Sequence, residues 1–287
     1  KLKVSNFVNA AITANTAKTS NATHSGEVTG ATALTIADGV VDEANLKVSN
    51  APTNGYVLTA QSGNTGGMTW AEAASTGVDT QLTATSNIGL GANAVNSITT
   101  GDYNVGLGDE ALTATTTGTK NNAFGYSALE LNTTGNFNVA VGHKTLEANT
   151  TASYNTGLGY FSLTANTTGA NNVAVGFRAL ATNTTASNNT AVGYDSLYAN
   201  TTGASNTAVG HAALDANTTA NDNAAFGYHA LSGNTTGASN TGIGHLALYA
   251  NTTASNNTAV GKSALTANTT GAHNSALGYQ ALVTNTT

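Results

Sequence analysis

The feature that most restricts the fold of this chain is a short unit that recurs at a constant interval without insertion. A glycine that follows an apolar residue marks each unit. These glycines recur every 17 residues, from Gly91 through Gly108 to Gly278. With this glycine counted as position 0, position −1 is always Val, Leu, Ile or Phe, position −2 is Ala or Gly, and position −4 is Asn. Such a strict period of seventeen indicates a repeat architecture, in which each unit packs mainly against its neighbours.

Other positions of the unit are fixed as well. Position +4 is Leu in eleven units and Val95 in the first, and Asn-Thr-Thr begins at position +7 in ten units. Charged and aromatic residues keep mostly to the remaining positions. We therefore expect the fixed positions to lie inside the fold and the variable ones outside.

The length of the unit points to β-structure. It is too short for a repeat built from two helices, and the alternation within N-T-A-V-G is typical of a strand. We predict an all-β chain, a β-solenoid or β-roll of about twelve coils. Each coil would have a strand at N-T-A-V-G, a bend, a second short strand around A-L and a turn at Asn-Thr-Thr. A stack with a rise of about 4.8 Å per coil would be roughly 55 to 60 Å long.

The asparagines at position −4 have a structural explanation in such a stack. Equivalent side-chain amides of successive coils lie one above the other, so they can donate and accept hydrogen bonds along the pile. We predict a structural ladder formed by Asn87, Asn104, Asn121, Asn138, Asn155, Asn172, Asn189, Asn206, Asn223, Asn240, Asn257 and Asn274.

The Asn-Thr-Thr turns also match the acceptor sequence for N-glycosylation. Nothing else in the sequence indicates the eukaryotic secretory route that this modification needs, so the structural explanation is preferred.

A second period, twice as long as the first, overlies it. The residue after Asn-Thr-Thr alternates between Gly and Ala from Gly135 to Gly271. The units with Gly carry Tyr at position +1 from Tyr126 to Tyr228, and the units between them carry His or Phe. Tandem duplication of two coils explains this pattern as well as a structural difference between alternate coils does.

Residues 1–85 are less regular and form a separate segment before the repeats of residues 86–287. This segment holds the only Pro, Met and Trp of the chain. The phrase PTNGYVLTAQSGNTGGMTW predicts a hairpin, with a turn at residues 52–55 and strands near Tyr56 and Met68. A piece this small buries little surface, so we expect it to share a core with copies of itself.

Composition excludes several classes of function. The net charge is −6, and the eight Lys and Arg residues are spread along the chain without a basic patch for nucleic acid or anionic lipid. There is no cysteine for a disulfide or a thiolate, and no apolar run approaches the roughly 18 residues that span a membrane. The first residues do not have the pattern of a signal peptide, so we expect none there, and the missing initiator Met suggests a fragment.

The pattern N-x-A-[VILF]-G-x-x-[AS]-L resembles the head repeat of trimeric autotransporter adhesins, the YadA-like left-handed β-roll. The longer form with N-T-T-G and the hairpin phrase resemble parts of bacteriophage tail fibres. The resemblance implies a parallel homotrimer that forms an extended shaft, other fibre or virion proteins as partners, and a place on the virion or cell surface. The adhesin unit is shorter than the unit of this chain, which leaves the geometry of the extra turn open.

The small residues favour close association whatever the family. Position −2, the glycine and position +3 would leave a flat face with little bulk, as Ala174, Gly176 and Ala179 illustrate. Flat faces pack closely on other sheets.

The sequence offers no catalytic cluster, no calcium-binding nonapeptide and no phosphate-binding loop with Lys. We therefore expect neither an enzyme nor a bound cofactor or metal, although a histidine shared by three protomers could face a common ion. Position +1 could form a stripe that binds a host-surface glycan or protein, although a plain stacked column is the preferred interpretation. The stripe consists of Tyr126, His143, Tyr160, Phe177, Tyr194, His211, Tyr228 and His245.

The prediction is thus a structural fibre protein, the stiff trimeric shaft of a phage tail fibre that serves host attachment. A bacterial surface adhesin or extracellular filament on the same β-roll is the alternative. An ice-binding solenoid is a third class, disfavoured because Thr133 and Thr134 would point to opposite faces if that segment were extended.

Overall fold

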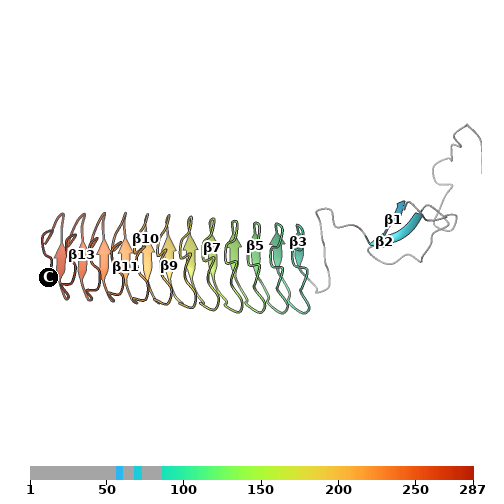
Figure 1. Cartoon of the computed structure of the whole chain (residues 1–287), viewed down its shortest axis with the longest axis horizontal. Helices are drawn as coiled ribbons and strands as arrows, with labels where there is room; N and C mark the ends of the chain where they lie inside the picture. Colours follow the sequence, from blue (N-terminus) through green and yellow to red (C-terminus); the bar gives the residue numbers. More distant parts are fainter. Residues whose placement is uncertain (1–55, 61–67, 73–85) are drawn as a thin grey trace, which may run out of the picture. The chain divides into compact units, whose positions relative to one another are not determined.

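The structure, a computed structural model, describes residues 56–60, 68–72 and 86–287 (Figure 1). All regular elements in this part of the chain are strands. The contacts divide the chain into two units, residues 1–73 and 74–287, whereas the sequence placed the boundary after residue 85.

The first unit contains one described element pair. Strands β1 (Tyr56–Ala60) and β2 (Met68–Glu72) pair antiparallel, with Tyr56 opposite Glu72. The two strands of the predicted hairpin are therefore present. Its turns and the rest of the N-terminal segment lie outside the described residues.

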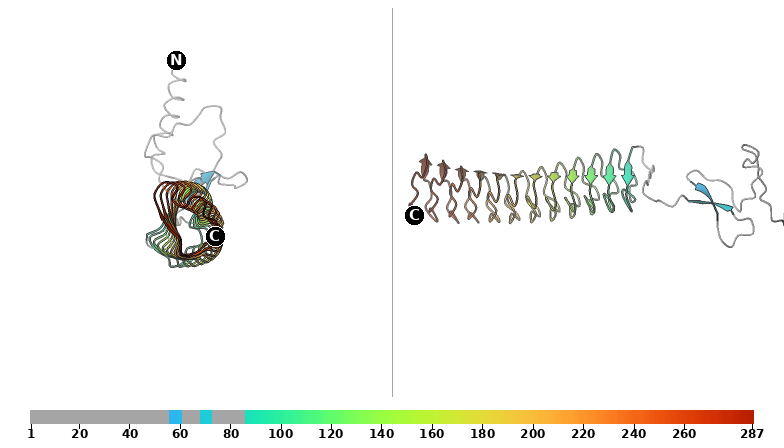
Figure 2. Two further views of the ribbon diagram at one scale, coloured as in Figure 1. Left: turned by 90° about the vertical axis from the view of Figure 1, so that its left-hand side faces the viewer. Right: turned by 90° about the horizontal axis from the view of Figure 1, so that it is seen from above.

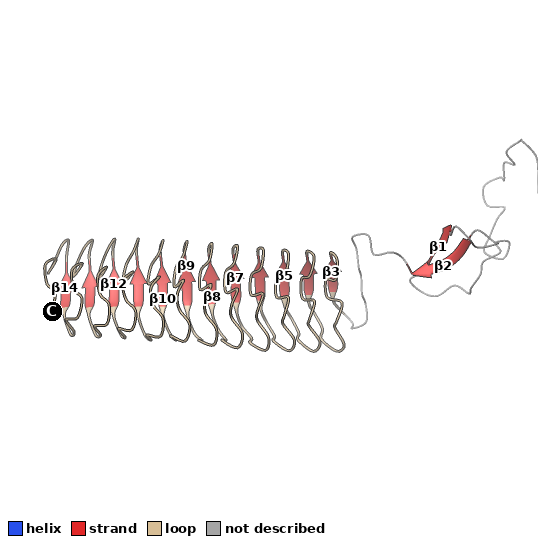
Figure 3. Cartoon of the chain, in the orientation of Figure 1, coloured by secondary structure: helices blue, strands red, loops and turns tan. Residues whose placement is uncertain are grey.

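The second unit is a parallel β-solenoid whose twelve strands, one short strand in each coil, form a single sheet (Figure 3). Each strand covers positions −3 to −1, and it pairs in register with the equivalent strands of the coils before and after it. The strands are β3 (Ile88–Leu90), β4 (Val105–Leu107), β5 (Asn122–Phe124), β6 (Val139–Val141), β7 (Thr156–Leu158), β8 (Val173–Val175), β9 (Thr190–Val192), β10 (Thr207–Val209), β11 (Ala224–Phe226), β12 (Thr241–Ile243), β13 (Thr258–Val260) and β14 (Ser275–Leu277).

Seen along its axis, the solenoid superimposes coil on coil with a small rotation between successive coils (Figure 2). The interior is thin. It is filled by the small residue at position −2, the residue at position +3 and the leucine at position +4, as in Ala174, Ala179 and Leu180, all with no exposed surface. Alanine and leucine supply most of these side chains, so the apolar part of the interior is small in volume.

The second strand predicted around A-L is wrong. The residues from position +1 to position +6 form turns, and positions +2 and +4 have positive φ, for example 53° at Leu129. This conformation is unfavourable for leucine, at roughly 1 kcal/mol or more per residue. It is offset by complete burial of Leu129 and by its N–H, which donates to the carbonyl of Thr145 in the next coil at 3.1 Å.

The glycine at position 0 ends every strand. Its φ lies between 121° and 138° in all twelve coils, a region that residues with a side chain rarely adopt. A Cβ atom at Gly176 would also overlap the backbone of Gly193 in the next coil. Both constraints explain why this glycine is invariant.

Candidate functional site

The twelve asparagines at position −4 lie inside the solenoid and join its coils. In all eleven successive pairs, the backbone N–H of one asparagine donates to the side-chain oxygen of the asparagine one coil earlier, as Asn172 does to Asn155 at 2.9 Å. The amide nitrogen of Asn172 donates to the carbonyl of Ala186 at 2.8 Å. Each amide therefore satisfies buried backbone groups that would otherwise lack a partner.

The asparagines of the Asn-Thr-Thr turns form a second ladder. Here the side-chain amides bond to one another directly: Asn183 donates to Asn166 at 2.8 Å and to the carbonyl of Ala186 at 3.0 Å. The same bond joins nine successive pairs, from Asn132 to Asn285. In the folded chain these amide nitrogens are engaged and, from Asn132 to Asn268, fully buried, which argues against glycosylation there. The sequence analysis did not predict this second ladder. The only sign of it in the sequence is that asparagine recurs at position +7 in ten units.

The rings at position +1, which we call the ring column, stack on one another along the rod. Phe177 and Tyr194 lie 5.2 Å apart between centroids with 13° between planes, and Tyr194 and His211 lie 5.1 Å apart with 7°. The stack runs unbroken through all eight residues of the predicted stripe, from Tyr126 to His245. Since each inner ring has a ring against both faces, a ligand would meet mainly ring edges and the Tyr and His polar atoms.

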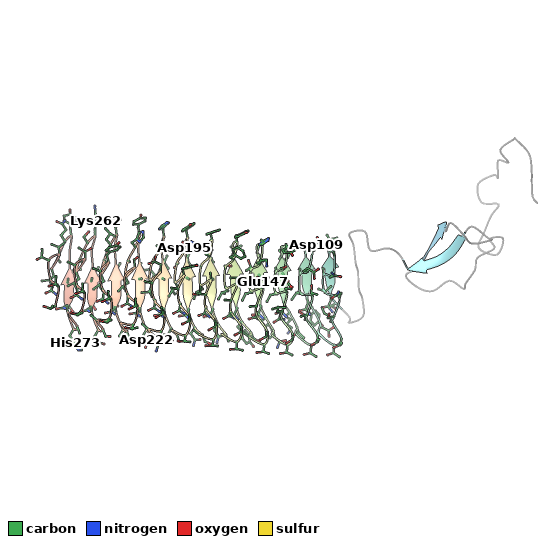
Figure 4. All side chains as sticks on the ribbon, in the orientation of Figure 1. Asp109, Glu147, Asp195, Asp222, Lys262 and His273 are labelled. Carbon is green, nitrogen blue, oxygen red and sulfur yellow. The ribbon has the colours of Figure 1, made fainter. Side chains whose placement is uncertain are left out.

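Charged residues gather beside the ring column. Nine of the twelve charged residues after residue 86 occupy positions +1, +2 and +5. Arg178 makes two hydrogen bonds to Asp195, at 2.8 and 2.5 Å, which raise the pKa of the guanidinium. Lys144 bonds to Glu147 at 2.6 Å, and this hydrogen bond raises its pKa. Figure 4 shows Lys262 at this edge of the rod and Asp222 and His273 at the opposite edge.

The flat face predicted from small residues is not on the surface. Ala174 and Ala179 are fully buried inside the coil, because position −2 of the strand points inward. Positions −3 and −1 point outward instead, and together they form what we call the sheet face. Position −1 is apolar in every coil, yet its side chain is half-buried or exposed, with exposures of 46% at Leu158 and 40% at Ile243.

The two threonines of each Asn-Thr-Thr turn also differ from expectation. The segment is a bend and not an extended strand; Thr133 is half-buried, with its hydroxyl donating to the carbonyl of Thr150, and Thr134 is exposed. The premise of an extended segment is therefore wrong, but only the second threonine of the turn is exposed, so the turns present one column of threonines and not two.

Alternate coils differ in structure. In coils with Gly at position +10, both threonine N–H groups donate to one carbonyl of the next coil, as Thr167 and Thr168 do to Thr184. In coils with Ala, only the first threonine does so, as Thr184 does to Thr201. A Cβ atom at Gly169 would overlap the carbonyl oxygen of Ala186. The two-coil period of the sequence thus corresponds to a difference in turn hydrogen bonding between alternate coils, whether or not it arose by duplication.

Within residues 86–287 no three His, Asp or Glu side chains come together in a group that could hold a metal ion. The part of the chain that the structure describes also contains no helix of the length and apolarity needed to cross a membrane.

Comparison of the chain with protein-family models, with curated proteins and with solved structures finds no match in any of the three.

Proposed function

We propose that the chain is the shaft of a surface fibre of the phage tail-fibre type, in which three parallel copies associate through their sheet faces and hold a host-attachment region away from the particle. The solenoid supplies stiffness, because every coil is hydrogen-bonded to the next along the strand and the first asparagine ladder, and from Asn132 onward along the second ladder as well. The association of copies buries a further apolar layer outside the thin core of each coil stack.

The observation that carries the proposal is the column at position −1. It is apolar in all twelve coils although its side chains are half-buried or exposed. Nothing inside a single coil requires this, since an outward-facing strand position accepts polar residues, as position −3 does at Thr190 and Asn122. An apolar column that is invariant and exposed indicates a partner surface.

The chemistry of the sheet face supports the same partner. None of the twelve charged residues after residue 86 lies at position −3 or −1. Burying one half-exposed Val or Leu contributes on the order of 1 kcal/mol, so a single contact is too weak, but a column of twelve acts together. A second copy in parallel register has the same period and contacts every coil at once.

The test is the mass and shape of the chain in solution, by light scattering combined with small-angle X-ray scattering. We expect a rod with three times the 28.4 kDa mass of one chain. The double substitution Val175→Asp and Val209→Asp places charges on the sheet face and is expected to give single chains.

A matched control places the same charges on another surface. Ser205→Asp and Ser239→Asp lie at exposed positions away from the sheet face, and we expect this variant to keep the wild-type mass. A monomeric wild-type rod, or equal masses for the two variants at unchanged circular dichroism, would overturn the proposal.

A further inference from the structure

The threonine at position +9 is identical in every coil and exposed in every coil. In ten coils it is the second threonine of the Asn-Thr-Thr turn, and no hydrogen bond within the described part of the chain involves its hydroxyl group. We call this column the threonine row; it consists of Thr100, Thr117, Thr134, Thr151, Thr168, Thr185, Thr202, Thr219, Thr236, Thr253, Thr270 and Thr287.

The neighbouring threonine at position +8 provides an internal comparison. It is equally invariant, but its hydroxyl donates to the backbone carbonyl of the equivalent threonine in the next coil, as Thr167 does to Thr184 at 3.0 Å. This bond is present at all eleven steps of the stack. Bonding between coils therefore explains why position +8 is always threonine. No contact within the described part of the chain explains why position +9 is always threonine.

Recent duplication does not explain the threonine row either. Other exposed positions of the same coils have diverged: position +12 holds Tyr103, Lys120, Phe137, Asn171 and Ser205 among others. Positions +1, +2 and +5 have diverged as well. A surface residue that stays constant while its exposed neighbours change indicates a contact with something outside the chain.

The chemistry around the threonine row narrows what that contact is. The row presents hydroxyl and methyl groups at a spacing of about 4.8 Å, and nine of the twelve charges lie at other positions of the coil. The remaining three, Asp102, Lys120 and Asp222, stand at positions +11 and +12, and Lys120 lies over the Phe137 ring at 4.9 Å. Three residues on, at position +12, the first coils expose Tyr103 by 59%, Phe137 by 41% and Tyr154 by 58%. Three residues of chain span at most about 11 Å, so one ligand could reach both.

The rings at position +12 differ from the ring column in one respect. Phe137 and Tyr154 stack at 5.0 Å, but the coils on either side of Tyr103 and the coil after Tyr154 carry no ring at this position. A ring face is therefore free of a stacked neighbour at each of these tyrosines. Free ring faces beside a row of neutral hydroxyl groups suit the apolar C–H faces and hydroxyl groups of sugars.

We propose that the threonine row, together with the rings at position +12 of the first coils, binds a neutral, hydroxyl-rich polysaccharide that lies along the rod. Each hydroxyl contact is weak, and affinity comes from many equivalent contacts along one extended ligand. This inference goes beyond the shaft function and does not require the copies to associate.

The test is affinity electrophoresis of the full chain in native gels that contain hydroxyethyl cellulose, galactomannan or dextran, with alginate as a charged comparison. We expect at least one neutral polysaccharide to retard the chain. Replacing Thr134, Thr151, Thr168 and Thr185 by valine should weaken this retardation by about tenfold or more, because four hydroxyl contacts are lost.

Two further variants control for changes in folding. Serine at the same four positions keeps the hydroxyl groups and should retain binding. Thr164→Val and Thr266→Val make the same chemical change at position +5, on the charged edge, and should leave binding unchanged. The proposal is overturned by no retardation in any neutral polysaccharide, by equal retardation of the valine variant, by retardation in alginate alone, or by adsorption to ice without polysaccharide binding.

Discussion

The interior of the solenoid and its outer surface both contain positions that are the same in every coil, but the causes of that sameness differ. Inside, Asn172 and Asn183 each bond to the coil before and to the backbone that follows. Outside, Leu158 and Thr168 stand at fixed positions without any such side-chain bond, and both are exposed. Invariance within a repeat thus has two sources, the stacking of the coils and contact with a partner, and only the structure separates them.

We expect the largest loss of stability from a substitution in the buried asparagine ladder. Asn172→Asp replaces the amide that donates to the carbonyl of Ala186 with a buried carboxylate facing that carbonyl. We expect a loss of about 3 kcal/mol or more in the free energy of unfolding at neutral pH, measured by urea denaturation. Burial raises the pKa of such a carboxyl, so its protonation at acidic pH restores a donor and the deficit should shrink as the pH falls. The exposed neighbour serves as control, and a comparable loss in Asn188→Asp would show that the ladder is not the cause.

The next effect sharpens the comparison between alternate coils. Gly169→Ala places a Cβ atom on the carbonyl oxygen of Ala186, and we expect it to cost about 2 kcal/mol. The reverse change in the next coil, Ala186→Gly, removes a side chain that fits and should cost about 0.5 to 1 kcal/mol. Thermal unfolding of the two variants checks this. Equal and small effects would assign the Gly and Ala alternation to duplication alone.

A smaller effect separates the two threonines of one turn. Thr167→Val removes a hydroxyl that donates to the carbonyl of Thr184, and we expect a loss of about 1 kcal/mol. Thr168→Val removes a hydroxyl that is exposed, and its stability should stay within about 0.5 kcal/mol of wild type. Urea midpoints of the two variants test the difference. If Thr168→Val is the more destabilised, position +9 has a structural role and the argument for an external ligand fails.

The smallest effect is a gain. Thr115 stands at the head of the second ladder, where the later coils have asparagine, and its buried hydroxyl has no hydrogen-bond partner. Thr115→Asn adds one rung to the ladder, with Asn132 as the next, and should stabilise the chain by about 1 kcal/mol. A shift of the melting temperature measures it. Thr113→Asn, at a half-buried position outside the ladder, should produce no such gain.

Much of the fold follows from the sequence. The period determines the coil length, and the alternation around position −2 identifies the strand, as the pairing of Ala174 with Ala191 shows. The second strand was wrong because Leu129 and its equivalents adopt a positive φ that no local preference of leucine indicates. Only packing inside the coil and bonding to the next coil hold them there.

The surfaces were harder to predict for a related reason. The fixed small residues Ala174 and Ala179 were expected on an outer face, although they fill the interior. The fixed residue at Leu158 was expected inside, although its side chain points outward. An invariant apolar residue looks the same in sequence whether it packs within its own coil or against another chain. Only the strand geometry shows whether its side chain points inward or outward.

The most direct test of association through the sheet face uses the absence of cysteine from the chain. Two single-cysteine variants are compared: Leu158→Cys on the sheet face and Ser205→Cys on another exposed surface. The rate at which a soluble maleimide labels each thiol is measured in native buffer. We expect labelling at position 158 to be at least about tenfold slower than at position 205, because it requires dissociation of the copies, and the two rates to converge in the Val175→Asp and Val209→Asp background. Equal rates in native buffer would contradict the account.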